Sequence, residues 1–106
     1  MRCPEYLKWL RGCACWACGA NAGRMEAAHY RGSDVPAEDR GGVGLKPADC
    51  WAVPLCHDCH ALQHTEGHDA FDRRAGAKMR DAAAASWSYW LYHTDAGRRW
   101  RERHGT

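Results

Sequence analysis

The chain has 106 residues, a length that fits one domain. Its 15 lysine and arginine residues nearly balance 13 aspartate and glutamate residues, so the formal net charge of +2 alone does not indicate nucleic-acid binding. No segment approaches the ~18 apolar residues of a membrane-spanning helix, and the first residues lack the apolar run of a secretory signal, which favours a cytoplasmic protein outside the membrane.

The N-terminal segment predicts a short helix followed by a tight turn. Residues 4–11 begin with a proline, which suits the first turn of a helix, and carry apolar side chains on one side. The glycine at position 12 is expected to end this helix. Residues 13–19 hold a Cys-x-x-Cys pair and a glycine after it, which allows a tight turn.

Two short strands are expected on either side of a long loop. Residues 25–31 predict a strand that presents His29, although alanine is a poor strand former. Residues 32–47 contain four glycines and two prolines without a core pattern, so we expect a long loop, functional or mobile. Residues 51–55 predict a second strand, in which Pro54 fits only an edge or an end.

Helices are expected after the second strand. Residues 57–66 predict a helix that bears two histidines on one face. Residues 69–93 carry apolar side chains at intervals near 3.6 and an alanine run, which predicts one long helix. Residues 95–97 are expected to break it, and residues 98–104 to form a further helical turn or a basic tail.

Basic residues concentrate toward the C-terminal end. Residues 69–106 carry eight basic and five acidic side chains, whereas residues 1–68 carry seven and eight. Twelve of the fifteen cations are arginine, whose planar guanidinium suits phosphate oxygens. A solvated arginine-rich surface explains the same composition, so phosphate binding is one of two interpretations.

Seven cysteines include two Cys-x-x-Cys pairs, Cys15 with Cys18 and Cys56 with Cys59. In a reducing compartment such pairs favour metal or redox use, and an odd total argues against a complete set of disulfides. Redox pairs usually open a helix in a βαβ unit, which this pattern lacks. Because zinc prefers four tetrahedral ligands, we predict a structural zinc site, which would help a domain of this size to fold.

The remaining thiols are less clearly assigned. Cys13 lies two residues before Cys15, so the first turn offers three thiols, although the spacing of Cys15 and Cys18 suits zinc better. Cys3, Cys13 and Cys50 are expected to be small buried residues, with a second, minor zinc site as the alternative.

Three histidines lie around the predicted zinc site. His60 and His64 are four residues apart on the predicted helix, a spacing at which two imidazoles can share one divalent cation. His29 stands alone in its strand, where it could take a proton from water that attacks a metal-bound phosphate. The alternative is ordinary surface or structural histidine, and His57 and His68 near the same face add to this ambiguity.

The order of these motifs resembles the HNH nuclease family, whose fold is the ββα-metal or His-Me finger. The resemblance covers about residues 13–71, and the runs EAAHYR, GGVGLKPAD, PLCHDCHALQH and HTEGHDAF are similar to a phage-associated branch that includes a recombinase-dependent nuclease. It implies a bacterial or phage-encoded protein. Its fold would be a small α+β structure, a zinc-stapled ββα-metal finger with flanking helices.

The resemblance implies a role for each matching position. His29 matches the general base, His64 matches the terminal histidine that binds the catalytic metal, and His60 is expected to be a second ligand. The catalytic ion would be Mg²⁺ or Mn²⁺, while the four paired cysteines would hold structural Zn²⁺. The implied activity is metal-dependent hydrolysis of phosphodiester bonds in DNA.

Two positions depart from the family pattern. Many members place aspartate or histidine directly before the base as another metal ligand, where this chain has Ala28. The asparagine that orients the base would fall near Trp51. Asp49 is expected to serve as the polar partner instead, with a turn residue after Pro47 as the alternative.

Three basic residues flank the expected site in the loop. Arg31, Arg40 and Lys46 are candidate DNA-binding residues, although single basic residues in loops are usually only solvated. No pattern in the chain encodes sequence-specific recognition, so little intrinsic specificity is expected.

The chain is expected to form a single domain, residues 1–106. Residues 13–71 would be the zinc-stapled core and residues 72–106 a C-terminal helical extension. Tryptophans of this extension could form an exposed apolar patch for a protein partner; these are Trp87, Trp90 and Trp100.

Two other functions compete with the nuclease. A non-catalytic zinc module that binds nucleic acid or protein explains the cysteines and arginines equally well, and Ala28 favours it. A zinc deaminase also pairs a histidine with a Pro-Cys-x-x-Cys turn but needs His-x-Glu. Here Arg31 stands two residues after His29, and a leucine separates Pro54 from Cys56.

Overall fold

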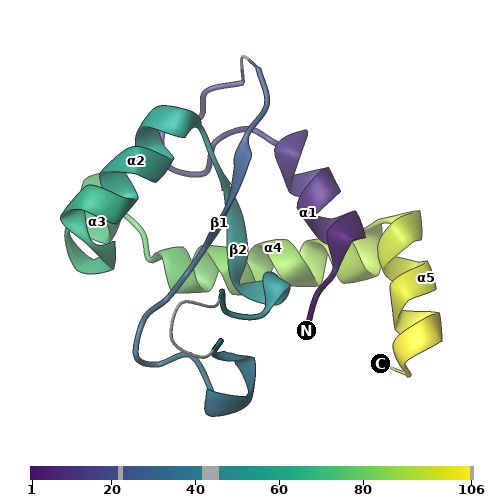
Figure 1. Ribbon diagram of the computed structural model, residues 1–106. Coiled ribbons are helices and arrows are strands. Elements are labelled where there is room, and N and C mark those ends of the chain that lie inside the picture. The colour runs from purple at the N-terminus through teal and green to yellow at the C-terminus, as the bar shows by residue number, and fades with distance from the viewer. Residues whose placement is uncertain (22, 42–45, 106) are drawn as a thin grey trace.

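The computed structural model describes residues 1–21, 23–41 and 46–105. It is a small α+β structure, in which a two-stranded sheet lies among helices (Figure 1). In chain order the helices and strands are α1 (Pro4–Arg11), β1 (Glu26–His29), β2 (Ala52–Leu55), α2 (His57–Glu66), α3 (His68–Ala75), α4 (Met79–His93) and α5 (Asp95–His104). Short 3-10 helices at Ala37–Asp39 and Asp49–Trp51 interrupt the long connection between the strands.

The two strands run antiparallel, and their register decides which side chains share a face. Ala28 pairs with Val53, and His29 pairs with Ala52. Because successive side chains of a strand point to opposite faces, Glu26 and Ala28 share one face and His29 lies on the other. In the described part of the chain, no strand pairs with the outer edge of β1.

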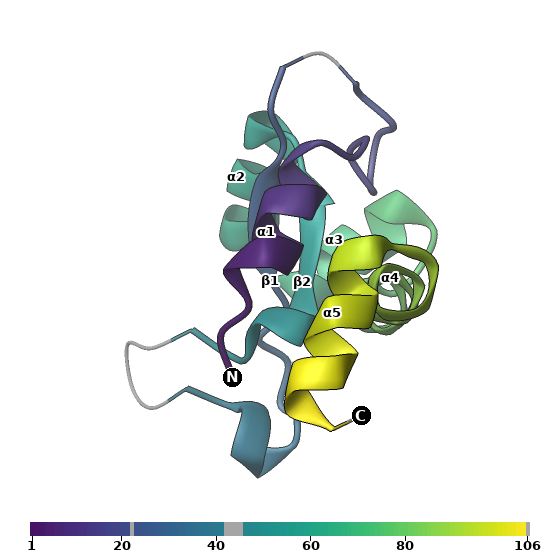
Figure 2. The same cartoon turned by 90° about the vertical axis from the view of Figure 1, so that its right-hand side faces the viewer.

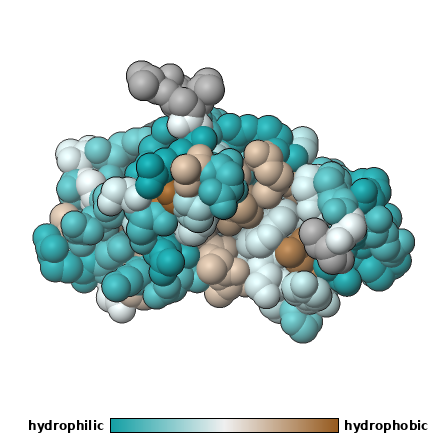
Figure 3. Space-filling model, turned by 90° about the horizontal axis from the view of Figure 1, so that it is seen from below, coloured by the Kyte–Doolittle hydropathy of each residue, from teal (hydrophilic) through white to brown (hydrophobic). Residues whose placement is uncertain are grey.

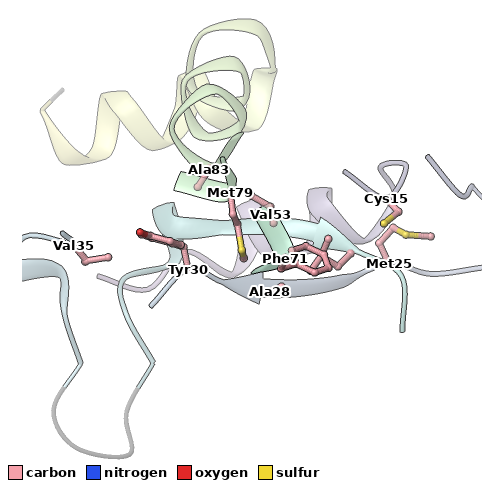
Figure 4. Packing of buried hydrophobic residues seen from close by; sticks show 10 residues of the cluster. Cys15, Met25, Ala28, Tyr30, Val35, Val53, Phe71, Met79 and Ala83 are labelled. Atoms are coloured by element: carbon pink, nitrogen blue, oxygen red, sulfur yellow. The ribbon is translucent and has the colours of Figure 1, made fainter. Parts of the chain in front are cut away.

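One hydrophobic cluster covers the Ala28 face of the sheet. It joins Val53 and Leu55 of β2 to Phe71 of α3 and Met79 of α4 (Figure 4). All four side chains are at most 1% exposed, so they supply the apolar burial that fixes α3 and α4 against the strands.

A second cluster lies on the opposite face, against α1 and the C-terminal end of α4. Ala52 of β2 packs there with Tyr6 and Leu10 of α1, Trp90 of α4 and Trp100 of α5. The strands therefore lie between α2 and α3 on one side and α1 on the other, while α4 runs past both clusters (Figures 1 and 2). The segment expected to be a C-terminal extension is thus part of the core.

The prediction of one long helix over residues 69–93 is wrong. Gly76 ends α3 in the left-handed conformation with φ of 76°, which a residue without Cβ adopts readily. The backbone N–H of Met79 then donates to the Asp72 carboxylate at 3.0 Å, where α4 begins. The apolar period continues through this break, which is why it suggested a single helix.

The expected break after the long helical segment lies at Thr94, and residues 95–97 already belong to α5. Thr94 caps α5 by accepting a hydrogen bond from Gly97 N at 2.9 Å, so the break lies one residue earlier. A Cβ on Gly97 would collide with the backbone of Trp90, so the close crossing of α4 and α5 requires glycine there. Trp90 and Trp100 are buried by this crossing rather than exposed, and Trp87 is half-buried.

Hydrophilic residues cover most of the face in Figure 3, where hydrophobic ones gather near the middle. None of the described helices is long and apolar enough to cross a membrane. Among the residues that the structure describes, the large apolar or aromatic side chains that are exposed are Met1, Leu62, Tyr89 and Tyr92.

Candidate functional site

The four paired cysteines converge on one point. The Sγ atoms of Cys15, Cys18, Cys56 and Cys59 all lie within 4.8 Å of one another. Cys18 Sγ and Cys56 Sγ are 3.8 Å apart, too far for a disulfide. Tetrahedral ligands about 2.3 Å from a zinc ion would lie about 3.8 Å from each other. This group, hereafter the cysteine clasp, is therefore placed to hold a metal such as zinc.

Local backbone structure presents these thiols. Gly19 takes a left-handed conformation after Cys18, and its N–H donates to Cys15 O at 2.9 Å, which closes the first turn. Trp16 N donates to Pro54 O at 2.8 Å and fastens that turn to the edge of β2. Cys56 is the N-cap of α2, so the second pair lies at a helix start.

Backbone donors favour the ionised form of one of the four thiols, Cys15. Burial raises the pKa of the Cys15 thiol, but backbone N–H groups of Cys56, Cys18 and Ala17 outweigh it and lower the pKa to about 7. A thiolate is the metal-binding form of cysteine, so this shift favours a cation at Cys15, whereas burial and the neighbouring thiols raise the pKa of Cys59.

His29 and Asp49 form a buried pair at the end of β1. His29 Nε2 lies 2.9 Å from Asp49 Oδ1, and the two residues are 7% and 2% exposed. Asp49 also accepts hydrogen bonds from Cys3 N at 2.6 Å and from Arg2 Nη1 at 2.9 Å. The carboxylate thus joins the N-terminal segment to the strand that carries His29.

The contact with Asp49 determines which ring nitrogen of His29 carries the proton and which can accept one. Burial would raise the pKa of the Asp49 carboxyl, but the donors from His29, Cys3 and Arg2 hold it below its ordinary value. An ionised carboxylate only accepts, so Nε2 carries the proton and Nδ1 keeps its lone pair. Burial lowers the pKa of His29 below 6.5, although Asp49 opposes this, so the ring is neutral at pH 7.

The other two candidate histidines meet on α2. His60 Nε2 and His64 Nε2 are 3.1 Å apart. Two imidazole nitrogens about 2.1 Å from one metal ion would lie about 3.0 Å apart if their bonds were perpendicular. On its other side, His60 Nδ1 lies 2.7 Å from Glu26 Oε1 of β1, and the second oxygen of Glu26 lies 3.0 Å from His57 Nδ1.

The Glu26 contact resembles one that many metal-binding histidines make, in which the ring nitrogen that does not bind the metal donates to a carboxylate. A carboxylate that accepts from one ring nitrogen fixes the tautomer and leaves the other nitrogen free for a cation. His60 and His64 thus fit two ligands of a divalent ion. Among the described residues, however, only the cysteine clasp brings three or more potential ligands together.

The His29–Asp49 pair and the His60–His64 pair lie on opposite faces of β1. His29 is on the α1 face, whereas Glu26 and its histidine partners are on the α2 face. In the described part of the chain, no hydrogen bond or ring contact joins His29 to His60 or His64. The helix α2 runs in a similar direction to β1 (Figure 1). His64 therefore lies about one helical turn, about 6 Å, beyond His60 in the direction in which β1 runs toward His29.

A hollow of about 450 Å³ extends along β1 and ends at His29. Its lining includes residues of β1 and of the segment just before it, and three cations, of which Arg24 belongs to that segment while Arg11 and Lys46 come from other parts of the chain. These residues are Met25, Glu26, Ala27 and His29, with Arg11, Arg24 and Lys46, and Leu7 of α1 completes the lining. A second hollow of about 320 Å³ adds Arg2 and Asp49 and shares Leu7, Arg11, His29 and Lys46 with the first.

A family model described as "Protein of unknown function (DUF968)" matches residues 1–86. The chain belongs to the DUF968 family. The DUF968 match contains the cysteine clasp and all three candidate histidines, and it leaves out α5. Comparison with curated proteins and with solved structures found no match.

The three loop residues expected to bind DNA have different surroundings. Lys46 borders both hollows. Arg40 lies away from them and donates to the carbonyls of Val35 and Ser33, at 2.7 and 2.5 Å. Arg31 is exposed, two residues after His29. Residues 42–45, part of the GGVGLKPAD run that resembles the HNH nucleases, lie outside the described residues.

Four contributors to this region of the DUF968 chain were not identified from the sequence. Glu26 binds His60, Arg2 binds Asp49, and Arg11 and Arg24 line the hollow. The partners of Glu26 and Arg2 lie 34 and 47 residues away. Only Glu26 could have been found from the sequence. It lies two positions before Ala28 and on the same face of the strand, so it is the nearest carboxylate to the position where a metal ligand was expected.

Proposed function

We propose that the protein is a metal-dependent HNH-type endonuclease that hydrolyses phosphodiester bonds in DNA. The observation that carries this proposal is His29, a buried neutral imidazole with one nitrogen fixed by Asp49 and the other available, beside a hollow lined by cations. A neutral imidazole held in one tautomer is suited to take a proton from water.

The chain's own residues would divide the work. His29 Nδ1 accepts the proton of the attacking water, while Asp49 stabilises the imidazolium that results. Attack on a phosphodiester is roughly in line with the leaving oxygen, so the base and the charge-stabilising group belong on opposite sides of the phosphate. His29 and the His60–His64 pair lie on opposite faces of β1, so a phosphate between them would have to lie across the unpaired edge of this strand.

His60 and His64 would hold the divalent ion, which supplies stabilisation of the negative charge that develops on the phosphate and leaving oxygen. Their Nε2 atoms fit two positions of such a site. Ala28 offers no ligand, and the Glu26 carboxylate instead holds His60 from behind. Mg²⁺ and Mn²⁺ are the expected ions, with water or phosphate oxygens completing the coordination.

A plasmid-nicking assay with added Mg²⁺ or Mn²⁺ tests the proposal. The zinc-loaded protein should convert supercoiled plasmid to the nicked or linear form. His29→Ala should lower the rate by about 10²–10⁴-fold, the usual contribution of a general base. His64→Ala should also lower it, and part of that loss should be recovered at higher metal concentration.

The matched control is His93→Ala, because His93 is exposed on α4 beyond the family match. It should cleave at the rate of the unsubstituted protein. The absence of any cleavage with either ion, or full cleavage by a folded His29→Ala protein, would refute the nuclease or its base respectively.

A second candidate is a non-catalytic zinc module that binds nucleic acid or protein. Two observations favour it: Ala28 removes a metal ligand, and Asp49 already has a structural task, because it holds the backbone of Cys3. In this case His29→Ala would lower stability without any change in a cleavage rate, because the unsubstituted protein would not cleave.

A further inference from the structure

We propose that Arg11, Arg24 and Lys46 form a phosphate-binding groove along the outer edge of β1, which holds a nucleic-acid strand beside His29. The inference takes the nature of its ligand from the proposed nuclease function. It concerns binding, however, and can be tested without cleavage.

Backbone hydrogen bonds bring the three cations together from separate segments. Met25 N donates to Arg11 O at 3.1 Å, which fastens the start of β1, and with it Arg24, to the end of α1. On the other side, the Arg2 guanidinium donates to Lys46 O at 2.7 Å and to Pro47 O at 2.9 Å. The groove is therefore built by the fold rather than by free side chains that happen to be close.

The positive charge of the groove is not neutralised from within. In the described part of the chain, no hydrogen bond or ion pair engages the side chains of Arg11, Arg24 or Lys46. Other arginines do have such partners, for example Arg74 with Glu66 at 2.8 Å. Cations that are left unpaired beside one hollow are available to phosphate oxygens.

The two acidic residues that border the groove are already engaged. Glu26 lies against His57 and His60, at 3.0 and 2.7 Å. Asp49 is paired with Arg2 and His29, both at 2.9 Å. Four cations, Arg2, Arg11, Arg24 and Lys46, line the two hollows against these two carboxylates, so the formal charge around the groove is positive.

The shape suits an extended polyanion. The hollows of about 450 and 320 Å³ share Leu7, Arg11, His29 and Lys46, so they adjoin along the surface between α1 and β1. Arg24 and Lys46 are exposed, which keeps the space open to solvent. Lys46 and His29 line both hollows, so this cation borders the same space as the imidazole.

Fluorescence anisotropy with a labelled DNA duplex tests the groove, with single-stranded DNA and RNA of the same sequence as further arms. The zinc-loaded protein is measured without added Mg²⁺ or Mn²⁺ at several salt concentrations. The triple variant Arg11→Ala, Arg24→Ala, Lys46→Ala should bind at least tenfold more weakly. The slope of log K against log salt should shrink by about 0.9 for each lost contact to duplex phosphate.

Two matched variants make this result specific. Arg73→Ala with Arg99→Ala removes two exposed arginines that have no hydrogen bond or ion pair in the described residues and lie outside both hollows, so affinity and slope should hardly change. Arg11→Lys keeps the charge and should retain most of the affinity. Zinc content and circular dichroism identify any variant that fails to fold, in which case the single substitutions decide.

The outcomes separate the groove from the nuclease. If the protein binds nucleic acid through these residues but does not cleave it, the proposed groove is supported and the proposed nuclease function is refuted. If the protein cleaves DNA and the triple variant retains full affinity and the full salt slope, the proposed groove is refuted and the proposed nuclease function is supported. Absence of binding to all three nucleic acids overturns the groove.

Discussion

The two histidine sites beside β1 are built in different ways. His29 is buried, and its partner Asp49 is twenty residues away and satisfied by three donors. His60 and His64 are neighbours on one helix, where Glu26 contacts His60 from one side and His64 is exposed. The first site is part of the packing of the protein, whereas the second is a local arrangement that opens toward solvent.

This difference suggests different tasks. A proton acceptor benefits from burial and a fixed tautomer, because both set its pKa and the direction of its lone pair. A site that binds an exchangeable ion and a phosphate oxygen needs open coordination positions. The cysteine clasp serves both sites, because it fastens α2 and the turn before β1 to the same edge of the sheet.

The largest expected effect is loss of both sites together when the clasp loses its metal. Structural zinc contributes on the order of 10 kcal/mol in small zinc-dependent folds, comparable to the whole stability of a small domain. Cys56→Ser should therefore leave a protein without a cooperative thermal transition. Circular dichroism melts and metal analysis of the purified protein would measure this.

Cys13→Ser is the control for the clasp. Cys13 is the one thiol of residues 13–19 that lies outside the clasp. Its Sγ lies 3.4 Å from Trp9 O, a contact that a serine hydroxyl can also make. This variant should bind one zinc per chain and melt like the unsubstituted protein. A metal-free protein that melts cooperatively at the same temperature would show that the clasp is not needed for folding.

The second prediction separates the two sites by stability. Asp49→Ala would leave His29 Nε2, Cys3 N and part of the Arg2 guanidinium without their shared acceptor. A buried donor left without an acceptor costs about 1–3 kcal/mol, and we expect a loss of about that size because His29 and Cys3 N lose their acceptor while Arg2, about half exposed, can turn to solvent. Chemical denaturation would measure it.

His64→Ala is the comparison for that measurement. His64 is exposed and its substitution leaves no buried group unpaired, so the free energy of unfolding should change little. If the two variants were equally stable, the His29–Asp49 pair would not be the fixed element that its burial indicates.

Local signals in the sequence predicted part of this fold well. The helices at residues 4–11 and 57–66 have the expected bounds, because proline, cysteine and glycine signals mark their ends. The two strands also occur where expected. The division between α3 and α4 was missed, because a hydrophobic period reports which side faces the core and does not report a change of helix direction.

The candidate site shows the same limit. Spacing alone was enough to predict that the four cysteines meet, and the structure confirms it. The roles of Asp49, His29, His60 and His64 remain predictions, although the contacts of Asp49 with His29 and of His60 with His64 are now observed. Arg11 and Arg24 could not be assigned, because their convergence depends on how α1 docks against β1.

The smallest expected effect is a pH dependence that belongs to the buried site alone. Because the folded protein holds the pKa of His29 below 6.5, the unfolded chain binds more protons in the interval between the two pKa values. The stability contributed by neutral His29 is therefore present above pH 6.5 and declines as the pH falls below it. NMR titration of the imidazole should give a midpoint below 6.5.

Asp49→Asn gives a sharper test, because removing the negative charge of Asp49 shifts the pKa of His29 in a known direction. The Asp49 carboxylate raises the pKa of His29 against the larger effect of burial, so its neutral replacement should move the midpoint still lower. His29→Gln should remove this contribution to the decline in stability below pH 6.5, whereas His93→Gln should leave it. A midpoint above 6.5 in the folded protein would mean that Asp49 outweighs burial. His29 would then be partly charged near neutral pH and poorly suited to accept a proton from water.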